Sequence, residues 1–374
     1  MTRDSKINIV DFANFSRTHV AVIGGGAWGT ALAMTSERAG RSVSLWIREA
    51  EVAAVTAETR ENAVFLPGFS LPASISVTAD LADAARDASI ALLVVPSQHI
   101  RAVAARLRGV LPAQATVVIC SKGVEQRTGA LLSTVVAEEL PDHPLAVLSG
   151  PTFAAEVAAG MPTAVTIASA DAALNPSRSQ AARVARALGT RTFRPYVSDD
   201  VIGVEVSGAV KNVIALASGM ATGLGFGANT RAALVSRGLN EIQELGAALG
   251  GRRDTVTGLS GVGDLTLTCS SEQSRNMRFG MALAAGRSPA DVFEGRPVVV
   301  EGVDNAVSVT DLARGLGVDM PICEAVRAVV VDGRPIPDMM DALLRRPFKG
   351  EPTDLGLSIP HDVSGITVKH IAGA

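Results

Sequence analysis

Aromatic side chains, cysteines and charged residues are all scarce in this chain of 374 residues. Aromatics make up 3% of it, the formal net charge is −3, and no basic tract occurs, so we expect no nucleic-acid partner. The three cysteines, Cys120, Cys269 and Cys323, lie far apart, and the five histidines show no H-x-x-x-H spacing. These spacings argue against a disulfide framework or a metal site, and they favour a reducing, cytoplasmic compartment.

Apolar runs of the kind that signal peptides and membrane spans require are also missing. Residues 1–16 contain no such run. The most apolar window, Val201–Met220, carries Glu205, Lys211, Asn212 and three glycines, which predicts a buried helix rather than a membrane span. With 47% apolar and 19% charged residues, the chain is expected to be a soluble protein of two domains with a sizeable core.

Lysine is used sparingly. Five of the 34 basic residues are lysine and the other 29 are arginine, and between residues 18 and 345 the only lysines are Lys122 and Lys211. Arginine keeps its proton at ordinary pH, whereas a lysine in dry surroundings can release it. We therefore interpret these two interior lysines as candidates for proton chemistry.

The first half of the chain alternates strand and helix patterns. Strands are predicted at 19–23, 43–47, 90–95, 116–120, 145–148 and 164–168, and helices at 30–39, 98–107 and 179–188. Continuous apolar runs such as Ile90–Val95 suit strands that are buried on both faces. The alternation predicts an α/β fold with a doubly wound, Rossmann-type parallel sheet.

The second half reads differently, because strand-like runs become rare after about residue 198. Helices are predicted at 201–220, 230–249, 276–285, 305–316, 324–330 and 339–344. We predict a dinucleotide-binding domain at 18–198, an all-α substrate domain at 199–347 and a tail at 348–374. The tail contains Gly and Pro without a clear period, and we expect it to be poorly ordered.

Residues 24–29, GGGAWG, have the pattern G-x-G-x-x-G between a predicted strand and a predicted helix. In a dinucleotide-binding turn, Gly24 would permit the tight turn, Gly26 would let the backbone approach a pyrophosphate, and Gly29 would let helix and strand pack closely. The helix N-terminus adds amide donors for the anion. A tight turn without a ligand is the alternative, and the strand–turn–helix context favours the dinucleotide.

The end of the second predicted strand bears on the choice of cofactor. An Asp or Glu is usual there to hold the ribose 2′-hydroxyl of NAD(H), but this chain has Arg48 followed by Glu49. An arginine suits a 2′-phosphate and favours NADP(H), with use of both cofactors left open. A solvated surface arginine is the alternative.

The two interior lysines lie in different contexts. Lys122 follows the strand at 116–120, at the sheet edge where ligands bind in open α/β folds, although an exposed loop lysine would fit there too. Lys211 lies within the apolar helix, too far along it from Glu205 to pair with it. Its neighbours at i±3 and i±4 are small or apolar: Ser207, Gly208, Ile214 and Ala215. Because these neighbours offer little that could neutralise the ammonium, we expect a lowered pKa and a general-base role. The alternative is a stem on apolar surface with its head in water.

Two polar clusters follow in the second half. Residues 258–265, GLSGVGDL, read as a glycine-rich loop whose Asp264 would orient a base or hold a substrate hydroxyl. Ser274, Arg275 and Asn276 precede a helix and form a good receptor for a small phosphate, unless Ser274 only caps the helix and Arg275 is solvated. Val299–Gly302 read as a short apolar stretch that runs into a loop.

Together, these motifs resemble the NAD(P)-dependent glycerol-3-phosphate dehydrogenases of the bacterial type. The resemblance covers about residues 18 to 345 and rests on GGGAWGTALA (24–33), FLPG (65–68), SKG (121–123), SGPTFAAE (149–156), KN (211–212), GLSGVGDLTLTC (258–269) and QSRNMRFG (273–280). It implies a homodimer that interconverts dihydroxyacetone phosphate and sn-glycerol 3-phosphate with NADP(H) or NAD(H), for glycerophospholipid synthesis.

The resemblance also implies roles for individual residues, with Lys211 as the proton acceptor. The implied substrate contacts are Lys122, Gly150, Thr152, Lys211, Asp264, Ser274, Arg275 and Asn276. Together with the glycine turn, the implied cofactor contacts are Gly24, Gly26, Ala27, Trp28, Gly29, Arg48, Lys122, Ala154, Arg275, Val299 and Glu301. Ala27 departs from the serine common in the family, so one hydroxyl contact to the cofactor is lost.

Two other functions stay open at this point. One is a dehydrogenase of the β-hydroxyacid kind, which would use a helical-domain lysine on a carboxylate substrate. The other is a dinucleotide sensor without catalysis, against which the two interior lysines argue, because sensing needs no titrating amine.

Overall fold

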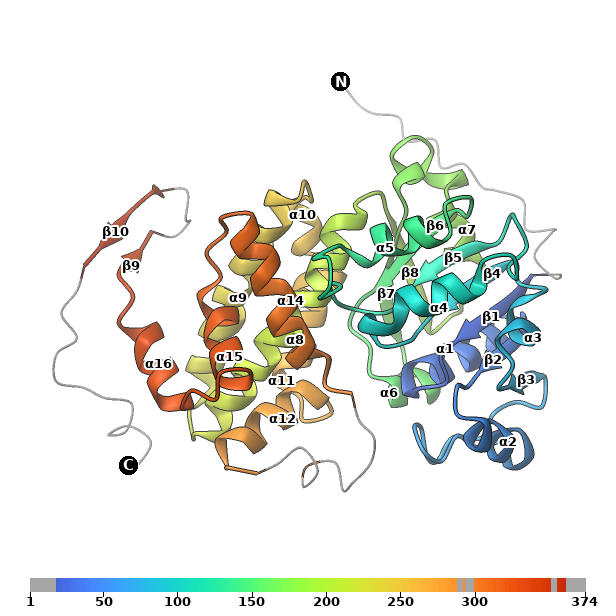
Figure 1. Ribbon diagram of the computed structural model, residues 1–374, viewed down its shortest axis with the longest axis horizontal. Helices are drawn as coiled ribbons and strands as arrows, with labels where there is room; N and C mark the ends of the chain where they lie inside the picture. Colours follow the sequence, from blue (N-terminus) through green and yellow to red (C-terminus); the bar gives the residue numbers. More distant parts are fainter. Residues whose placement is uncertain (1–17, 288–291, 293–298, 351–354, 361–374) are drawn as a thin grey trace.

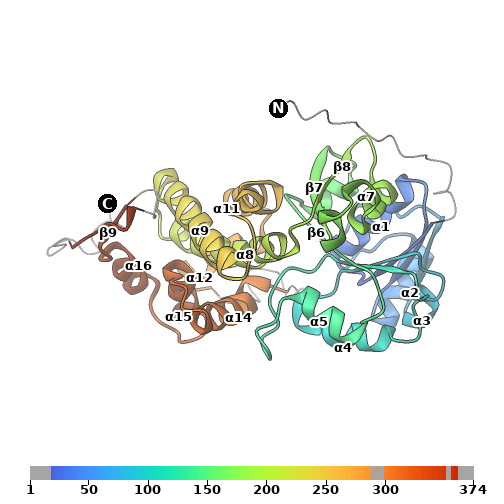
Figure 2. The ribbon, with the colours of Figure 1, turned by 90° about the horizontal axis from the view of Figure 1, so that it is seen from above.

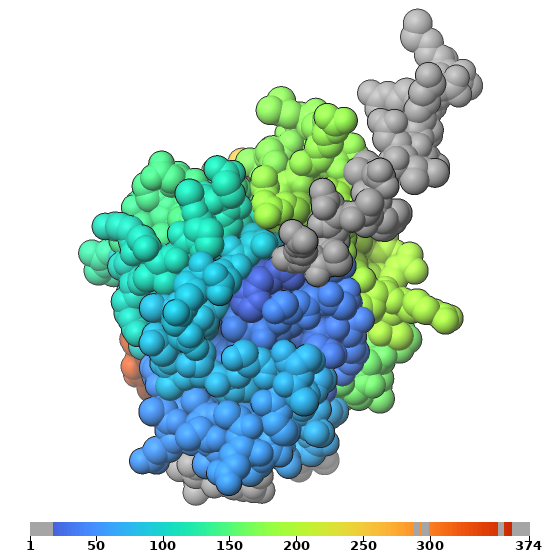
Figure 3. Space-filling model, turned by 90° about the vertical axis from the view of Figure 1, so that its right-hand side faces the viewer, coloured from blue at the N-terminus to red at the C-terminus, as the bar shows by residue number. Residues whose placement is uncertain are grey.

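The computed structural model describes residues 18–287, 292, 299–350 and 355–360. Figure 1 shows two units side by side, a sheet flanked by helices and a group of helices that begins at residue 201. Figure 3 shows the molecule from the side of the sheet unit. The surface there is formed mainly by segments of the first half of the chain, which are coloured blue to green.

Eight strands form the main sheet, in the order β3-β2-β1-β4-β5-β6-β7-β8. Their bounds are β1 (His19–Ile23), β2 (Ser42–Trp46), β3 (Ile75–Thr78), β4 (Ile90–Leu93), β5 (Thr116–Ile119), β6 (Leu145–Ser149), β7 (Thr163–Ala168) and β8 (Phe193–Ser198). Strands β1 to β6 are parallel, with Ile23 between Trp46 and Leu93 in the register. The order reverses between β1 and β4, which is where such sheets bind dinucleotides at their carboxyl edge.

Helices cover both faces of this sheet (Figure 2). They are α1 (Ala27–Arg38), α2 (Ala50–Thr59), α3 (Leu81–Ala85), α4 (Ile100–Leu107), α5 (Leu132–Glu139), α6 (Ala154–Ala158) and α7 (Gln180–Leu188). In β1, Val20 and Val22 belong to the core with α1 and α7, while Ala21 and Ile23 belong to the core with α3, α4 and α5. The predicted doubly wound sheet is therefore confirmed.

One strand runs against the prediction of a wholly parallel sheet, since β7 pairs with β6 in the antiparallel sense. Its connection contains only the five-residue α6. A helix of that length rises by about 7 Å, too little to carry the chain back along the sheet for a parallel return. Strand β8, which follows the longer α7, is parallel to β7.

The second unit packs around α8 (Val201–Gly223), and 83% of the most apolar window of this helix is buried inside the protein. Among the described residues, its other helices are α9 (Ala228–Ala248), α10 (Arg253–Val256), α11 (Asp264–Ser270), α12 (Arg275–Ala284), α14 (Glu301–Gly315), α15 (Pro321–Val330) and α16 (Ile336–Leu344). The expected loop at 258–265 is in fact a π-helical turn, Leu259–Gly263, that leads directly into α11.

Two other expectations need correction. Glu301 begins α14 instead of lying in a loop. In the tail, which we expected to be poorly ordered, β9 (Phe348–Lys349) and β10 (Ser358–Ile359) form an antiparallel pair. Ile359 lies opposite Phe348 in its register. The remainder of the predicted tail, at 351–354 and 361–374, and the leader before residue 18 lie outside the described residues.

Candidate active site

The glycine turn joins β1 to α1 at the carboxyl edge of the sheet. Gly24 has a φ of +128°, and a Cβ there would lie 2.7 Å from the carbonyl oxygen of Val94. A Cβ on Gly29 would lie 1.8 Å from the carbonyl oxygen of Gly24, so helix and turn meet backbone to backbone. Gly26 is the N-cap of α1, and no heavy atom lies within 4 Å of its Cβ position. This open space beside free helix N–H groups fits a dinucleotide pyrophosphate. Ala27 and Trp28 open the helix.

Arg48 lies just beyond the carboxyl end of β2, with 66% of its side chain exposed. Its Nε donates a hydrogen bond of 2.8 Å to Oε1 of Glu49. The guanidinium is therefore exposed and paired with an acid.

The two interior lysines meet at one carboxylate. Lys122 follows β5 and Lys211 lies in the middle of α8, while Asp264 begins α11. Nζ of Lys211 lies 2.5 Å from Oδ1 of Asp264, and Nζ of Lys122 lies 2.6 Å from Oδ2. Only 7% of the Lys211 side chain and 14% of the Lys122 side chain are exposed. The alternatives of a solvated head for Lys211 and an exposed loop for Lys122 are thereby excluded.

The expectation that little near Lys211 could neutralise its ammonium is wrong, because Asp264 lies 2.5 Å from it. Asp264 belongs to another helix, α11, so the residues that neighbour Lys211 along α8 do not indicate this partner. The hydroxyl of Thr268, one turn further along α11, lies 2.9 Å from the same Nζ. As expected, Glu205 does not pair with Lys211, and its carboxylate accepts hydrogen bonds from Ser133 instead.

The pKa of Lys211 is lowered from 10.5 to about 8, mainly because burial disfavours the charged amine. Asp264 acts in the opposite direction, and the second ammonium, on Lys122, adds to the lowering. The amine can therefore exist in both protonation states near neutral pH, which is what a group that gives and takes a proton requires.

The turn after β6 lies beside Lys122. The carbonyl oxygen of Gly150 is 3.4 Å from Nζ of Lys122 and also accepts from the hydroxyl of Thr152. Gly150 has a φ of +152°, and a Cβ there would lie 2.9 Å from Cα of Val165, so β7 requires a glycine at this point. Ala154 begins α6 nearby.

A network of amides joins the N-termini of α12 and α14. Asn276 donates to Oδ1 of Asn212 at 3.0 Å and accepts from the N–H of Gly302 at 3.0 Å. Asn212 in turn donates to Glu301 at 3.2 Å. The sequence singled out Asn276 and Glu301 but not this link through Asn212, the neighbour of Lys211.

Ser274 is the N-cap of α12, where its hydroxyl accepts from the N–H of Met277 at 3.2 Å. Arg275 begins the helix and is exposed. Val299, 39% exposed, lies just before α14. The capping alternative for Ser274 is thus realised in the structure.

Comparison with known proteins places these features in one family. The model of the N-terminal part of NAD-dependent glycerol-3-phosphate dehydrogenase matches residues 19–175, and the model of its C-terminal part matches residues 200–341. The chain belongs to the NAD-dependent glycerol-3-phosphate dehydrogenase family.

Individual relatives agree with this membership. Glycerol-3-phosphate dehydrogenase (NAD(P)+) of Rhodospirillum rubrum is 54% identical over 333 residues, which cover 89% of this chain and 94% of the relative. The protein of the same name from Parvibaculum lavamentivorans is 49% identical, over 89% of this chain and 98% of its own. The crystal structure of glycerol-3-phosphate dehydrogenase from Coxiella burnetii has a TM-score of 0.83 at 36% identity, covering 88% of this chain and all of that one.

Membership of the glycerol-3-phosphate dehydrogenase family decides between the functions that the sequence left open. The chain is an NAD(P)-dependent oxidoreductase, and neither the β-hydroxyacid alternative nor the sensor fits both family models.

Proposed function

We propose that the chain interconverts dihydroxyacetone phosphate and sn-glycerol 3-phosphate, with Lys211 as the group that exchanges the proton. The observation that carries this assignment is the buried amine of Lys211, held at 2.5 Å by Asp264 beside a second amine. When bound, the nicotinamide cofactor supplies the hydride to the carbonyl carbon of the substrate, or takes it back in the reverse direction.

The chain's own residues would then handle the proton and the charge. In reduction, the ammonium of Lys211 donates a proton to the oxygen at C2 of the substrate; in oxidation, the neutral amine accepts it. Lys122 adds positive charge close to that oxygen, which stabilises the developing alkoxide. Asp264 orients Lys211, since one carboxylate oxygen and the hydroxyl of Thr268 both contact Nζ.

The N-terminus of α12 is our candidate for the phosphate site. The exposed guanidinium of Arg275 is suited to bidentate binding of a phosphate, and the first N–H groups of the helix add to it. Asn276 keeps one amide hydrogen for a ligand while its other contacts link it to Asn212 and Gly302. Binding energy from the phosphate would hold the carbonyl beside Lys211.

We extend the proposal to the cofactor and the cell. NADP(H) is the preferred cofactor, with Arg48 binding its 2′-phosphate. Gly150 and Thr152 contact the substrate, and Ala154, Val299 and Glu301 contact the cofactor. The protein acts as a cytoplasmic homodimer, and its product feeds glycerophospholipid synthesis. Three free, buried cysteines, Cys120, Cys269 and Cys323, are consistent with a reducing compartment.

A spectrophotometric assay tests the reaction. Reduced-nicotinamide absorbance should fall when dihydroxyacetone phosphate is added to the protein with NADPH, and a panel of 3-oxo acids should give no such change. Turnover of an oxo acid in place of the triose phosphate would refute the substrate, and the absence of any turnover would refute the reaction.

A further inference from the structure

Helix α5 lacks a cap of its own. Its N-cap residue is Leu131, whose side chain cannot accept a hydrogen bond. Instead, Glu205 from α8 accepts from the backbone N–H of Ser133 at 2.8 Å and from the Ser133 hydroxyl at 2.5 Å. The first turn of a helix in the sheet unit is therefore capped by a carboxylate from the helical unit.

Capping α5 in this way costs free energy, because a carboxylate has to be buried. Glu205 is only 6% exposed, and no described residue forms an ion pair with it. Burial raises the pKa of Glu205 to about 7, against the opposing hydrogen bonds from Ser133. A serine or aspartate at position 131 would cap α5 locally without burying an unpaired acid. What Glu205 adds is a connection between the two units.

This connection between the two units lies at one end of the loop that carries Lys122. That loop runs from β5 to α5, so Ser133 marks its far end. Near its start, the side chain of Asn305 in α14 donates to the carbonyl oxygens of Lys122, at 3.5 Å, and of Ala209 in α8, at 3.1 Å. Both ends of the loop are therefore bonded to the helical unit.

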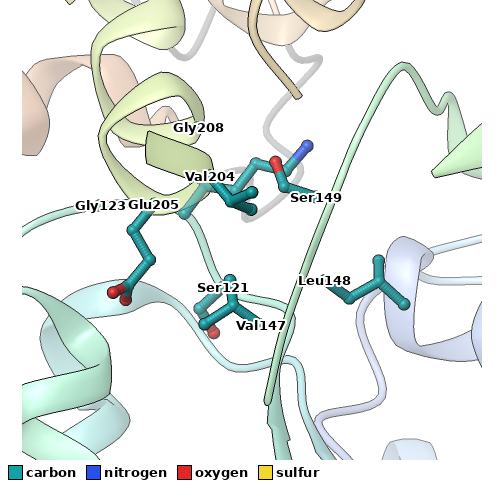
Figure 4. Close-up of a pocket in the computed structure, with 9 residues that line it drawn as sticks. Ser121, Gly123, Val147, Leu148, Ser149, Val204, Glu205 and Gly208 are labelled. Atoms are coloured by element: carbon teal, nitrogen blue, oxygen red, sulfur yellow. The ribbon is translucent and has the colours of Figure 1, made fainter. Parts of the chain in front are cut away.

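Between these two points, α8 packs directly against the lysine. A Cβ on Gly208 would lie 3.3 Å from Cγ of Lys122 and 3.3 Å from Oγ of Ser149. Gly208 lies one turn after Glu205 and one turn before Lys211. In Figure 4 the carboxylate of Glu205 points away from Ser149 and Gly208, at the edge of the small pocket that these residues line.

We propose that Glu205 is a positioning residue that clamps the Lys122 loop against α8 and so keeps the amines of Lys122 and Lys211 on the same carboxylate. This rests on the proposed function, in which both amines face the substrate oxygen. Without the clamp, the loop would move away from α8, Lys122 would leave Asp264, and the charge that stabilises the alkoxide would be displaced. A shift of about 1 Å at a reacting centre can cost up to a hundredfold in rate.

Glu241 provides a matched control. It is 5% exposed, lies in α9 and accepts from the backbone N–H groups of Ile322 and Cys323 at the start of α15. Burial raises its pKa to about 7 as well. It is thus the same residue type, equally buried, with the same capping function, but it connects two helices of one unit away from the two lysines.

The experiment compares Glu205→Ala, Glu205→Gln, Glu241→Ala and Glu241→Gln for unfolding temperature, kcat and KM. Glu205→Ala should lower kcat and kcat/KM for dihydroxyacetone phosphate by about tenfold with little change in the KM for NADPH. Glu205→Gln should recover most of the rate, because its amide can accept from the N–H and donate to the hydroxyl of Ser133. Both Glu241 variants should lose stability with kcat within about twofold of the wild type.

Two results would overturn the proposal. If Glu205→Ala kept its kcat and lost only as much stability as Glu241→Ala, Glu205 would be a structural cap. If Glu205→Gln lost as much rate as Glu205→Ala, its charge and not its hydrogen bonds would matter. Should Glu205→Ala fail to fold, Glu205→Leu, which removes both bonds to Ser133 and keeps most of the side-chain volume, takes its place, and an unchanged kcat in that variant would equally refute the clamp.

A second readout separates this proposal from the reaction itself. The rate at which acetic anhydride modifies Lys122, followed by mass spectrometry, requires no substrate. It should rise in Glu205→Ala and stay at the wild-type value in Glu241→Ala. An unchanged labelling rate in Glu205→Ala would refute the clamp, whereas an inactive wild type with normal labelling would refute only the proposed function.

Discussion

Lys211 and Asp264 are 53 positions apart in the chain, yet Nζ of one lies 2.5 Å from Oδ1 of the other in a buried site. The same carboxylate contacts Lys122 at 2.6 Å through its second oxygen. One acid thus contacts two amines, and once Lys211 has released its proton, Asp264 and Lys122 still form a neutral pair. This geometry allows Lys211 to change its protonation state without leaving a lone buried charge.

Replacing Asp264 by asparagine tests this balance. Asp264→Asn removes the opposite charge and leaves Lys122, so the pKa of Lys211 should fall below its present value of about 8. The pH at which kcat/KM for glycerol 3-phosphate oxidation reaches half its plateau should move down accordingly, and kcat should fall by about tenfold or more, because the amine loses its orientation. Asp254→Asn, in which an exposed aspartate of α10 is changed, serves as the control. A midpoint that does not move would show that Asp264 does not set the titration.

The two directions of the reaction should depend on pH in opposite ways. Oxidation needs neutral Lys211, so its kcat/KM should rise with pH and level off above about 8, where burial has placed the pKa of this amine. Reduction needs the ammonium and should lose rate over the same interval. Initial rates from pH 6 to pH 10 in both directions measure the effect. If the profiles run parallel, a group other than Lys211 carries the proton.

The removal of the amine altogether gives the largest effect. Lys211→Ala should lower kcat by about a hundredfold or more, the scale of general acid–base catalysis, with the Kd for NADPH nearly unchanged. Lys211→Arg should be as slow, because an arginine keeps its proton. Stopped-flow rates together with fluorescence titration of the cofactor measure both quantities. A near-normal kcat in either variant would remove Lys211 from the mechanism.

Sequence patterns predicted the parts of the fold and site that local chemistry determines. The glycine turn, the apolar strands and the helix around Lys211 follow from spacing, because each depends on residues a few positions apart. The antiparallel β7 followed from the brevity of α6, which the pattern of apolar residues did not reveal.

The sequence indicated that Asp264 would orient a base or hold a substrate hydroxyl, but not that its carboxylate would contact both lysines. Lys211 is surrounded by small and apolar residues along α8. Its acid, Asp264, begins α11 directly after a π-helical turn, in a segment that the sequence predicted to be a loop. Likewise, Leu131 at the N-cap of α5 does not indicate that Glu205 in α8 caps this helix. Contacts of this kind arise when helices distant in sequence pack together, and a single sequence does not encode them in any local period.

The choice between NADPH and NADH can be tested with one variant at Arg48 and one at Glu49. Arg48 is hydrogen-bonded to Glu49, so a 2′-phosphate would have to compete with this carboxylate for the guanidinium. Arg48→Asp should lower the ratio of kcat/KM for NADPH to that for NADH by roughly tenfold or more, since it replaces an attraction with a repulsion. Glu49→Gln should raise the same ratio, because it removes the carboxylate that competes with a 2′-phosphate for Arg48. The two variants together separate a specific reading of the phosphate from general damage to the groove, which would lower kcat/KM for both cofactors alike. Equal ratios in the wild type and both variants would mean that the exposed guanidinium is a solvated surface group and that cofactor choice lies elsewhere in the turn.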